Sequence, residues 1–80
     1  MIKNFGKFYL DMNRVLAILS VDQSNMRRFK KAASYDGKVV DLTYGEKTRS
    51  MLIMDSGHVI LTSYDPKELM ERIWREEDGF

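Results

Sequence analysis

The sequence predicts a small α+β domain with a mostly antiparallel sheet of about five strands and two helices. Three apolar, strand-like segments lie within residues 39–64, and a segment rich in helix formers occupies residues 25–35. A proline-initiated segment from residue 65 onward has the spacing of a second helix. Eighty residues suffice for one domain and not for two, so we expect residues 1–80 to form a single domain.

Five segments are expected to be strands because they are short, apolar and bounded by turn residues. They are residues 8–10, 15–19, 39–43, 48–54 and 58–64. Gly57 suits a tight turn, which predicts antiparallel pairing of the last two segments. We expect the last three segments to form a meander.

The last two strands carry apolar side chains on both faces, since Leu52 and Met54 alternate with Met51 and Ile53. Two helices of this size are expected to cover one face of the sheet. A domain this small buries only about 60% of its unfolded surface, so its core is marginal. We therefore expect a homo-oligomer that assembles through sheet and helix faces.

The first helix is predicted over residues 25–35, with Ser24 as its N-cap and Gly37 after its end. Its apolar side chains fall on one side of the helix. These are Met26, Phe29, Ala32 and Ala33.

The second helix is predicted to begin with Asp65 as N-cap, Pro66 in the first helical position and Glu68 close behind it. Its expected apolar stripe consists of Leu69, Met70, Ile73 and Trp74. Three acids, Glu76, Glu77 and Asp78, then lie beside the helix C-terminus, where the helix dipole disfavours them, so the last turn is expected to fray.

The formal net charge of +1 conceals an uneven distribution of charge. Residues 1–50 hold ten Lys and Arg against five Asp and Glu, whereas residues 51–80 hold three against seven. This division indicates either a basic surface for a polyanion or a dipolar protein without a nucleic-acid role. Absence of cysteine, of a signal-like N-terminus and of a long apolar run favours a cytoplasmic protein with no membrane partner.

The sequence offers no group of residues typical of an enzyme. It has no cysteine and one histidine, His58, and we find no Gly-rich phosphate loop and no recognisable Ser/His/Asp set. A structural role at a hairpin is the more frequent fate of such a histidine. We expect no catalysis, no metal, no cofactor and no small-molecule substrate.

Three basic features remain as candidate binding sites. Residues 27–31 carry four cations, which are more often simply the solvated face of a helix. Residues 44–49 combine a glycine turn with Lys47, Thr48 and Arg49, which are groups that bind phosphate oxygens. The third feature, Asn13-Arg14, looks the same as an ordinary turn followed by a surface arginine.

Four blocks together resemble a known family: Phe5-Gly6, the segment N-R-V-L-A-I at 13–18, the segment D-L-T-Y-G-E-K-T-R-S at 41–50, and M-D-S-G-H-V-I-L at 54–61. Over residues 5–73 the chain resembles the RemA-type extracellular matrix regulatory proteins of bacteria. The resemblance implies a fold similar to the LytTR DNA-binding domain. It also implies a nucleoid-associated transcription regulator, linked to biofilm formation, that binds double-stranded DNA as a closed ring of roughly seven or eight subunits.

The family's DNA-contacting positions fall here on Arg14, Lys47 and Arg49, with Asn13 and Thr48 beside them. Lys30 and Lys31 are expected to contribute far less. The chain departs from the family at Glu46, where a basic residue is usual, and we expect this acid to weaken phosphate binding. The alternative function is an oligomeric scaffolding or protein-interaction ring with weakened DNA binding.

Overall fold

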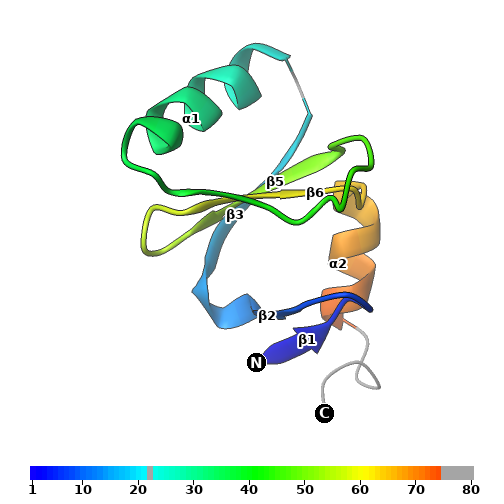
Figure 1. The fold of residues 1–80 in the computed structure, drawn as a ribbon. Helices are drawn as coiled ribbons and strands as arrows, with labels where there is room; N and C mark the ends of the chain where they lie inside the picture. The colour runs from blue at the N-terminus through cyan, green and yellow to red at the C-terminus, as the bar shows by residue number, and fades with distance from the viewer. Residues whose placement is uncertain (22, 75–80) are drawn as a thin grey trace.

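The computed structural model describes residues 1–21 and 23–74 and confirms an α+β domain with two helices (Figure 1). The described residues form two sheets, one of two strands and one of four. In chain order the elements are β1 (Ile2–Asn4), β2 (Tyr9–Asp11), the 3-10 turn η1 (Met12–Arg14), β3 (Val15–Ser20), α1 (Gln23–Tyr35), β4 (Val39–Asp41), β5 (Ser50–Met54), β6 (Val59–Thr62) and α2 (Pro66–Trp74).

The four-stranded sheet has the order β3-β5-β6-β4. The hairpin of β5 and β6 is antiparallel as predicted, and Gly57 adopts a φ of 89° in its turn. The predicted meander is wrong, because β4 pairs in parallel with β6 and β5 pairs with β3. Residues 42–49 form a loop much longer than a hairpin turn. The loop allows β5 to lie two positions away from β4 in the sheet, with β6 between them.

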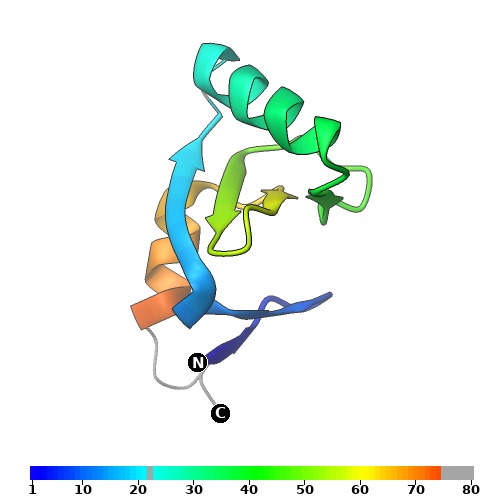
Figure 2. The same cartoon turned by 90° about the vertical axis from the view of Figure 1, so that its left-hand side faces the viewer.

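Both faces of the central strands are covered within one chain, so the expectation that the two helices share a face is wrong (Figures 1 and 2). One face packs against α2 and the N-terminal hairpin, with a buried cluster of Phe5, Leu10, Leu52, Ile60 and Leu69. The other packs against α1, with a buried cluster of Ala33, Met51, Val59 and Leu61. Neighbouring residues such as Met51 and Leu52 thus belong to different clusters, as strand geometry requires.

Apolar surface remains along the edge strand β3 and on the helices. The exposed fraction is 70% for Leu16, 43% for Phe29 and 42% for Met70. Exposed apolar side chains among the described residues also lie on the N-terminal hairpin and on β4. The sheet edge at β3 is thus one of several surfaces that an oligomer could bury, and the central strands are not among them.

Helix α1 begins at Gln23, so Ser24 lies in its first turn and is not the N-cap. Asp22, the residue before the helix, lies outside the described residues. The predicted stop at Gly37 is confirmed: its φ is 69°, and its N–H donates to Ser34 O at 3.0 Å while Lys38 N–H donates to Ala33 O at 2.8 Å. This pair of hydrogen bonds is a Schellman motif.

Helix α2 begins as predicted. The Lys67 N–H donates to Asp65 Oδ1 at 2.8 Å, and the Asp65 N–H donates to Glu68 Oε1 at 3.2 Å. These reciprocal bonds satisfy amides that the helix leaves free. Leu69 is buried and Met70 is partly exposed. The rest of the apolar stripe (the side chains of Ile73 and Trp74), the expected fraying and the acids at 76–78 lie outside the described part of the chain.

Replacing the cap should destabilise the domain. Asp65→Ala removes the acceptor for the Lys67 N–H, and we expect the free energy of unfolding to fall by about 1 kcal/mol. Urea unfolding at fixed protein concentration measures this change, with Lys67→Ala as a control that keeps both cap bonds. Equal unfolding midpoints for Asp65→Ala and the parent protein would show that the cap contributes nothing.

Candidate nucleic-acid interface

The loop that carries the predicted phosphate-binding cations begins with a fixed turn. Thr43 donates to Asp41 Oδ1 from its hydroxyl at 2.6 Å and from its N–H at 2.9 Å. The Glu46 N–H then donates to Thr43 O at 3.0 Å and closes a four-residue turn, in which Tyr44 has a φ of 55° and Gly45 a φ of 84°. Two positive φ angles are typical of a type I′ turn, which is unfavourable for a bulky residue such as Tyr44.

Contacts of the Tyr44 side chain hold this strained turn against the N-terminal hairpin. Its hydroxyl donates to Lys7 O at 3.2 Å. Its ring stacks on Phe8 with centroids 6.4 Å apart, and Lys7 Nζ lies 5.0 Å from the ring centroid. The strain is therefore offset by packing between segments far apart in the sequence.

Lys47, Thr48 and Arg49 follow the turn and lead into β5. The Arg49 backbone is fixed on both sides, because its N–H donates to Thr62 O at 2.8 Å and its carbonyl accepts from Val21 N–H at 3.2 Å. The next residue, Ser50, shares a buried hydrogen bond of 2.5 Å with the Thr62 hydroxyl. A rigid backbone thus presents the exposed side chains of Lys47 and Arg49 to solvent.

These three residues line an open depression of about 480 Å³, together with the end of β3 and the start of α2. Asp65 belongs to the same rim, and its carboxylate already accepts an amide at the N-terminus of α2. The Asp65 carboxylate thus occupies the Lys67 amide, and the positive charge that lines this depression comes from Lys47 and Arg49.

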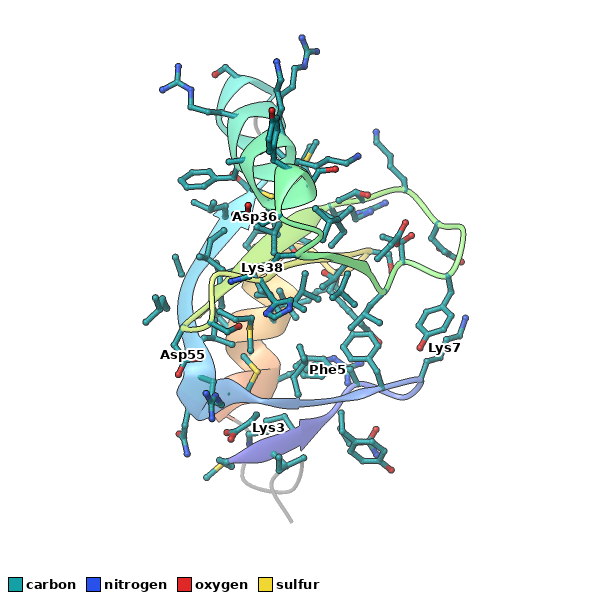
Figure 3. The ribbon with its side chains drawn as sticks, turned by 60° about the vertical axis from the view of Figure 1, so that its left-hand side comes forward. Lys3, Phe5, Lys7, Asp36, Lys38 and Asp55 are labelled. Carbon is teal, nitrogen blue, oxygen red and sulfur yellow. The ribbon has the colours of Figure 1, made fainter. Side chains whose placement is uncertain are left out.

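Arg14 lies in η1 and is held near the turn of the β5–β6 hairpin. Its Nε is 3.2 Å from Asp55 Oδ1, and the side chains of both residues are exposed (Asp55 is labelled in Figure 3). The Asp55 N–H also donates to Arg14 O at 2.9 Å. Asn13 is exposed beside it, with its N–H bonded to Asp11 Oδ1 at 3.1 Å. Asp55 was not predicted as the partner of Arg14, because the two residues are 41 positions apart in the sequence.

The structure of the chain does not bring Arg14 together with the loop cations. Val15 pairs with Met54 at one end of β3, and Ser20 pairs with Ser50 at the other. Arg14 precedes the first pair and Arg49 precedes the second, which separates them by roughly 20 Å along the strands. The predicted residues form two cationic positions and not one patch.

A further basic surface lies on α1. The side chains of Arg27, Arg28, Lys30 and Lys31 are exposed, as expected for a solvated helix face. They do not form ion pairs with any described residue. Tyr35, beside them, is 91% exposed.

Glu46 faces a different depression from the one lined by Lys47 and Arg49, and four aromatic residues are among its neighbours there. Among residues 1–21 and 23–74, no ion pair joins Glu46 to Lys47 or Arg49. Its charge is thus not neutralised by the cations that it adjoins in sequence.

The described residues contain neither a candidate metal cluster nor a candidate membrane-spanning helix. There, no three His, Cys, Asp or Glu side chains are close enough together to hold a metal ion. Nor does that part of the chain include a helix that combines the length and apolarity needed to cross a bilayer. His58 Nδ1 lies 2.6 Å from Ser56 Oγ, a structural contact within the hairpin turn.

Comparison with known proteins assigns the chain to a family. The sequence model of the RemA-like family, described as extracellular matrix regulatory protein A-like, matches residues 3–73. The chain therefore belongs to the RemA-like family, as the resemblance predicted; the similarity to LytTR domains stays a prediction.

Two bacterial relatives carry the name "Putative regulatory protein". The one from Thermotoga maritima is 43% identical over 60 residues, which cover 75% of this chain and 65% of that protein. The one from Dictyoglomus thermophilum is 39% identical over 79 residues, which cover 95% of this chain and 92% of the relative. The match to the Thermotoga protein thus leaves about a third of that relative outside the comparison.

The turn that begins the loop should be visible in the titration of Asp41. The hydroxyl and then the N–H of Thr43 hold the pKa of Asp41 below its ordinary value of 3.8, because they bond to its charged form. The stabilisation is fully present above pH 3.8 and is lost as pH falls through the lower pKa of the folded state.

Thr43→Val removes the hydroxyl with little change in shape, so the pKa of Asp41 should rise toward 3.8. Carboxyl-carbon NMR titration measures it, with Thr48→Val as the control. An unchanged Asp41 pKa in Thr43→Val would contradict this account of the turn.

Proposed function

We propose that this protein is a DNA-binding transcription regulator of the RemA type that acts as a homo-oligomer on the nucleoid. Membership of the RemA-like family and the names of its relatives support a regulatory role. The observation that carries DNA binding is the rigid 43–49 loop, which presents two exposed cations next to a hydroxyl. A preorganised loop loses little conformational entropy when it binds.

In this proposal the cations contact the phosphate backbone. The planar guanidinium of Arg49 can donate two parallel hydrogen bonds to a phosphate, and Lys47 adds a point charge. At the other end of β3, Arg14 contacts a second phosphate. To do so, its guanidinium leaves the ion pair with Asp55 and binds the phosphate instead. An exposed ion pair of this kind opposes the exchange by only about 0–1 kcal/mol.

Each subunit supplies few contacts, so affinity requires several subunits on one duplex. A closed ring repeats the same cations around its rim. Once one subunit has bound a curved duplex, its neighbours are held close to the same DNA, which raises the overall affinity. We place the contact between copies at the edge strand β3. There, the exposed Leu16 and Met70 flank an open depression of about 330 Å³ that Val15 and Ile18 also line.

Two observations favour the scaffolding alternative, in which an oligomer has lost most of its DNA affinity. Glu46 places a negative charge next to Lys47, and Asp55 already pairs with Arg14. Both acids lower the attraction of the candidate cations for phosphate. The alternative keeps the same oligomer and differs only in its affinity for DNA.

DNA binding should depend on Arg14, Lys47 and Arg49. We expect the plot of log affinity against log salt concentration to be less steep, by about one unit for each cation removed per engaged subunit, in Arg14→Ala and Lys47→Ala. Fluorescence anisotropy on one labelled duplex across a salt series gives these slopes.

Lys31→Ala on α1 is the matched control, with the same loss of charge, and should change affinity by less than about twofold. If only Lys31→Ala weakens binding, α1 is the DNA-binding face. If the parent protein does not bind even at low salt, the scaffolding alternative holds.

Multi-angle light scattering should give a mass several times the 9.4 kDa of one chain. Leu16→Glu puts a charge on the proposed contact between copies and should shift the protein toward the monomer. Tyr35→Glu introduces the same charge at an exposed site on α1 and should leave the mass unchanged. A parent protein of monomeric mass at micromolar concentration would refute the oligomer.

A further inference from the structure

A pocket that the DNA-binding proposal does not use lies where three segments meet: the N-terminal hairpin turn, the 42–46 loop and the junction of β6 with α2. Its volume is about 370 Å³, within the range of small-ligand sites. Four aromatic rings and two carboxylates line it, from Phe5, Phe8, Tyr44, Tyr64, Glu46 and Glu68. Lys7 stands at its edge, at the tip of the hairpin (Figure 3).

The aromatic residues of this pocket are held in place by one another and by hydrogen bonds. Phe5 stacks on Phe8 with centroids 5.3 Å apart, and Tyr64 meets Phe8 edge to face at 6.4 Å. The Tyr64 hydroxyl donates to Phe5 O at 2.5 Å, and that of Tyr44 donates to Lys7 O. A ligand would therefore meet rings that are already ordered, which favours binding.

The charged groups of the pocket favour a cation. Among the residues that line the pocket, Glu46 and Glu68 contribute two carboxylates and Lys7 one ammonium, while the Arg72 guanidinium lies next to the pocket, over the Phe5 and Tyr64 rings. The ring faces of this cluster already attract cations within the chain, with Lys7 Nζ 5.0 Å from the Tyr44 centroid and the Arg72 guanidinium carbon 4.9 Å from the Tyr64 centroid. Lys7 is exposed and on a long flexible stem, so a ligand cation can take its place over Tyr44.

We propose that this pocket binds a small organic cation, with a flat or methylated ammonium head group stacked on Tyr44 and Phe8 and neutralised by Glu46. This site gives Glu46 a function as the counter-ion of the ligand, at a position where the family resemblance leads us to expect a basic residue. Glu68, whose carboxylate is fixed by the cap of α2, supplies the second negative charge.

Ligand-observed saturation-transfer NMR on the full chain tests this site without DNA, so the result does not depend on the DNA-binding proposal. The probe is benzyltrimethylammonium, and we expect a dissociation constant on the order of 1 mM for a ligand of this size. Benzyl alcohol, which is neutral, and benzoate, an anion, carry the same ring and should bind at least about fivefold more weakly. Equal binding of benzyl alcohol, or no binding of the probe, would overturn the proposal.

Variants locate the probe. Glu46→Gln should weaken binding about three- to fivefold, in line with an exposed charge pair, whereas Glu71→Gln on α2 should not change it. Tyr44→Leu should abolish binding, and Tyr44→Phe, which keeps the ring, should stay within about twofold of the parent protein. If Tyr44→Leu does not fold, Glu46→Gln still tests the site. An unchanged dissociation constant of the probe in Glu46→Gln would show that the probe binds elsewhere.

Discussion

The apolar character of both faces of β5 and β6 is the constraint on which this fold depends. Side chains of a strand alternate between faces, so Met51 and Leu52 cannot enter the same core. The chain meets this constraint by placing α1 on one face and α2 with the N-terminal hairpin on the other (Figure 2). Edge strand β3 is then left with exposed apolar side chains, which the proposed oligomer could bury.

The same arrangement produces the candidate site. Because β4 pairs with β6, the chain must pass from one edge of the sheet to β5 through residues 42–49. That connection contains the strained Tyr44 turn, which is stable because the N-terminal hairpin packs against it. The turn separates the loop into two surfaces, with Glu46 on the aromatic side and Lys47 and Arg49 on the side of the end of β3.

Charge is also divided by the sheet. Arg14 and the loop cations occupy opposite ends of β3, and the cations of α1 lie with that helix on one face. A single chain does not gather them into one anion site. In an oligomer these weak contacts would be repeated, and together they could bind a long polyanion.

Local patterns in the sequence determined much of this protein. The spacing of apolar residues placed the predicted strands and helices, Asp65-Pro66 and Gly37 marked helix ends, and Gly57 marked the hairpin, because these signals act within a few residues of the chain. The block from 41 to 50 also indicated the family and the candidate cations. Only the tertiary structure decided the parallel pairing of β4, the opposite placement of the helices, the Arg14–Asp55 pair and the aromatic pocket at Glu46. Each of these joins residues far apart in the sequence, and their contacts depend on how whole elements pack rather than on the preference of any local segment.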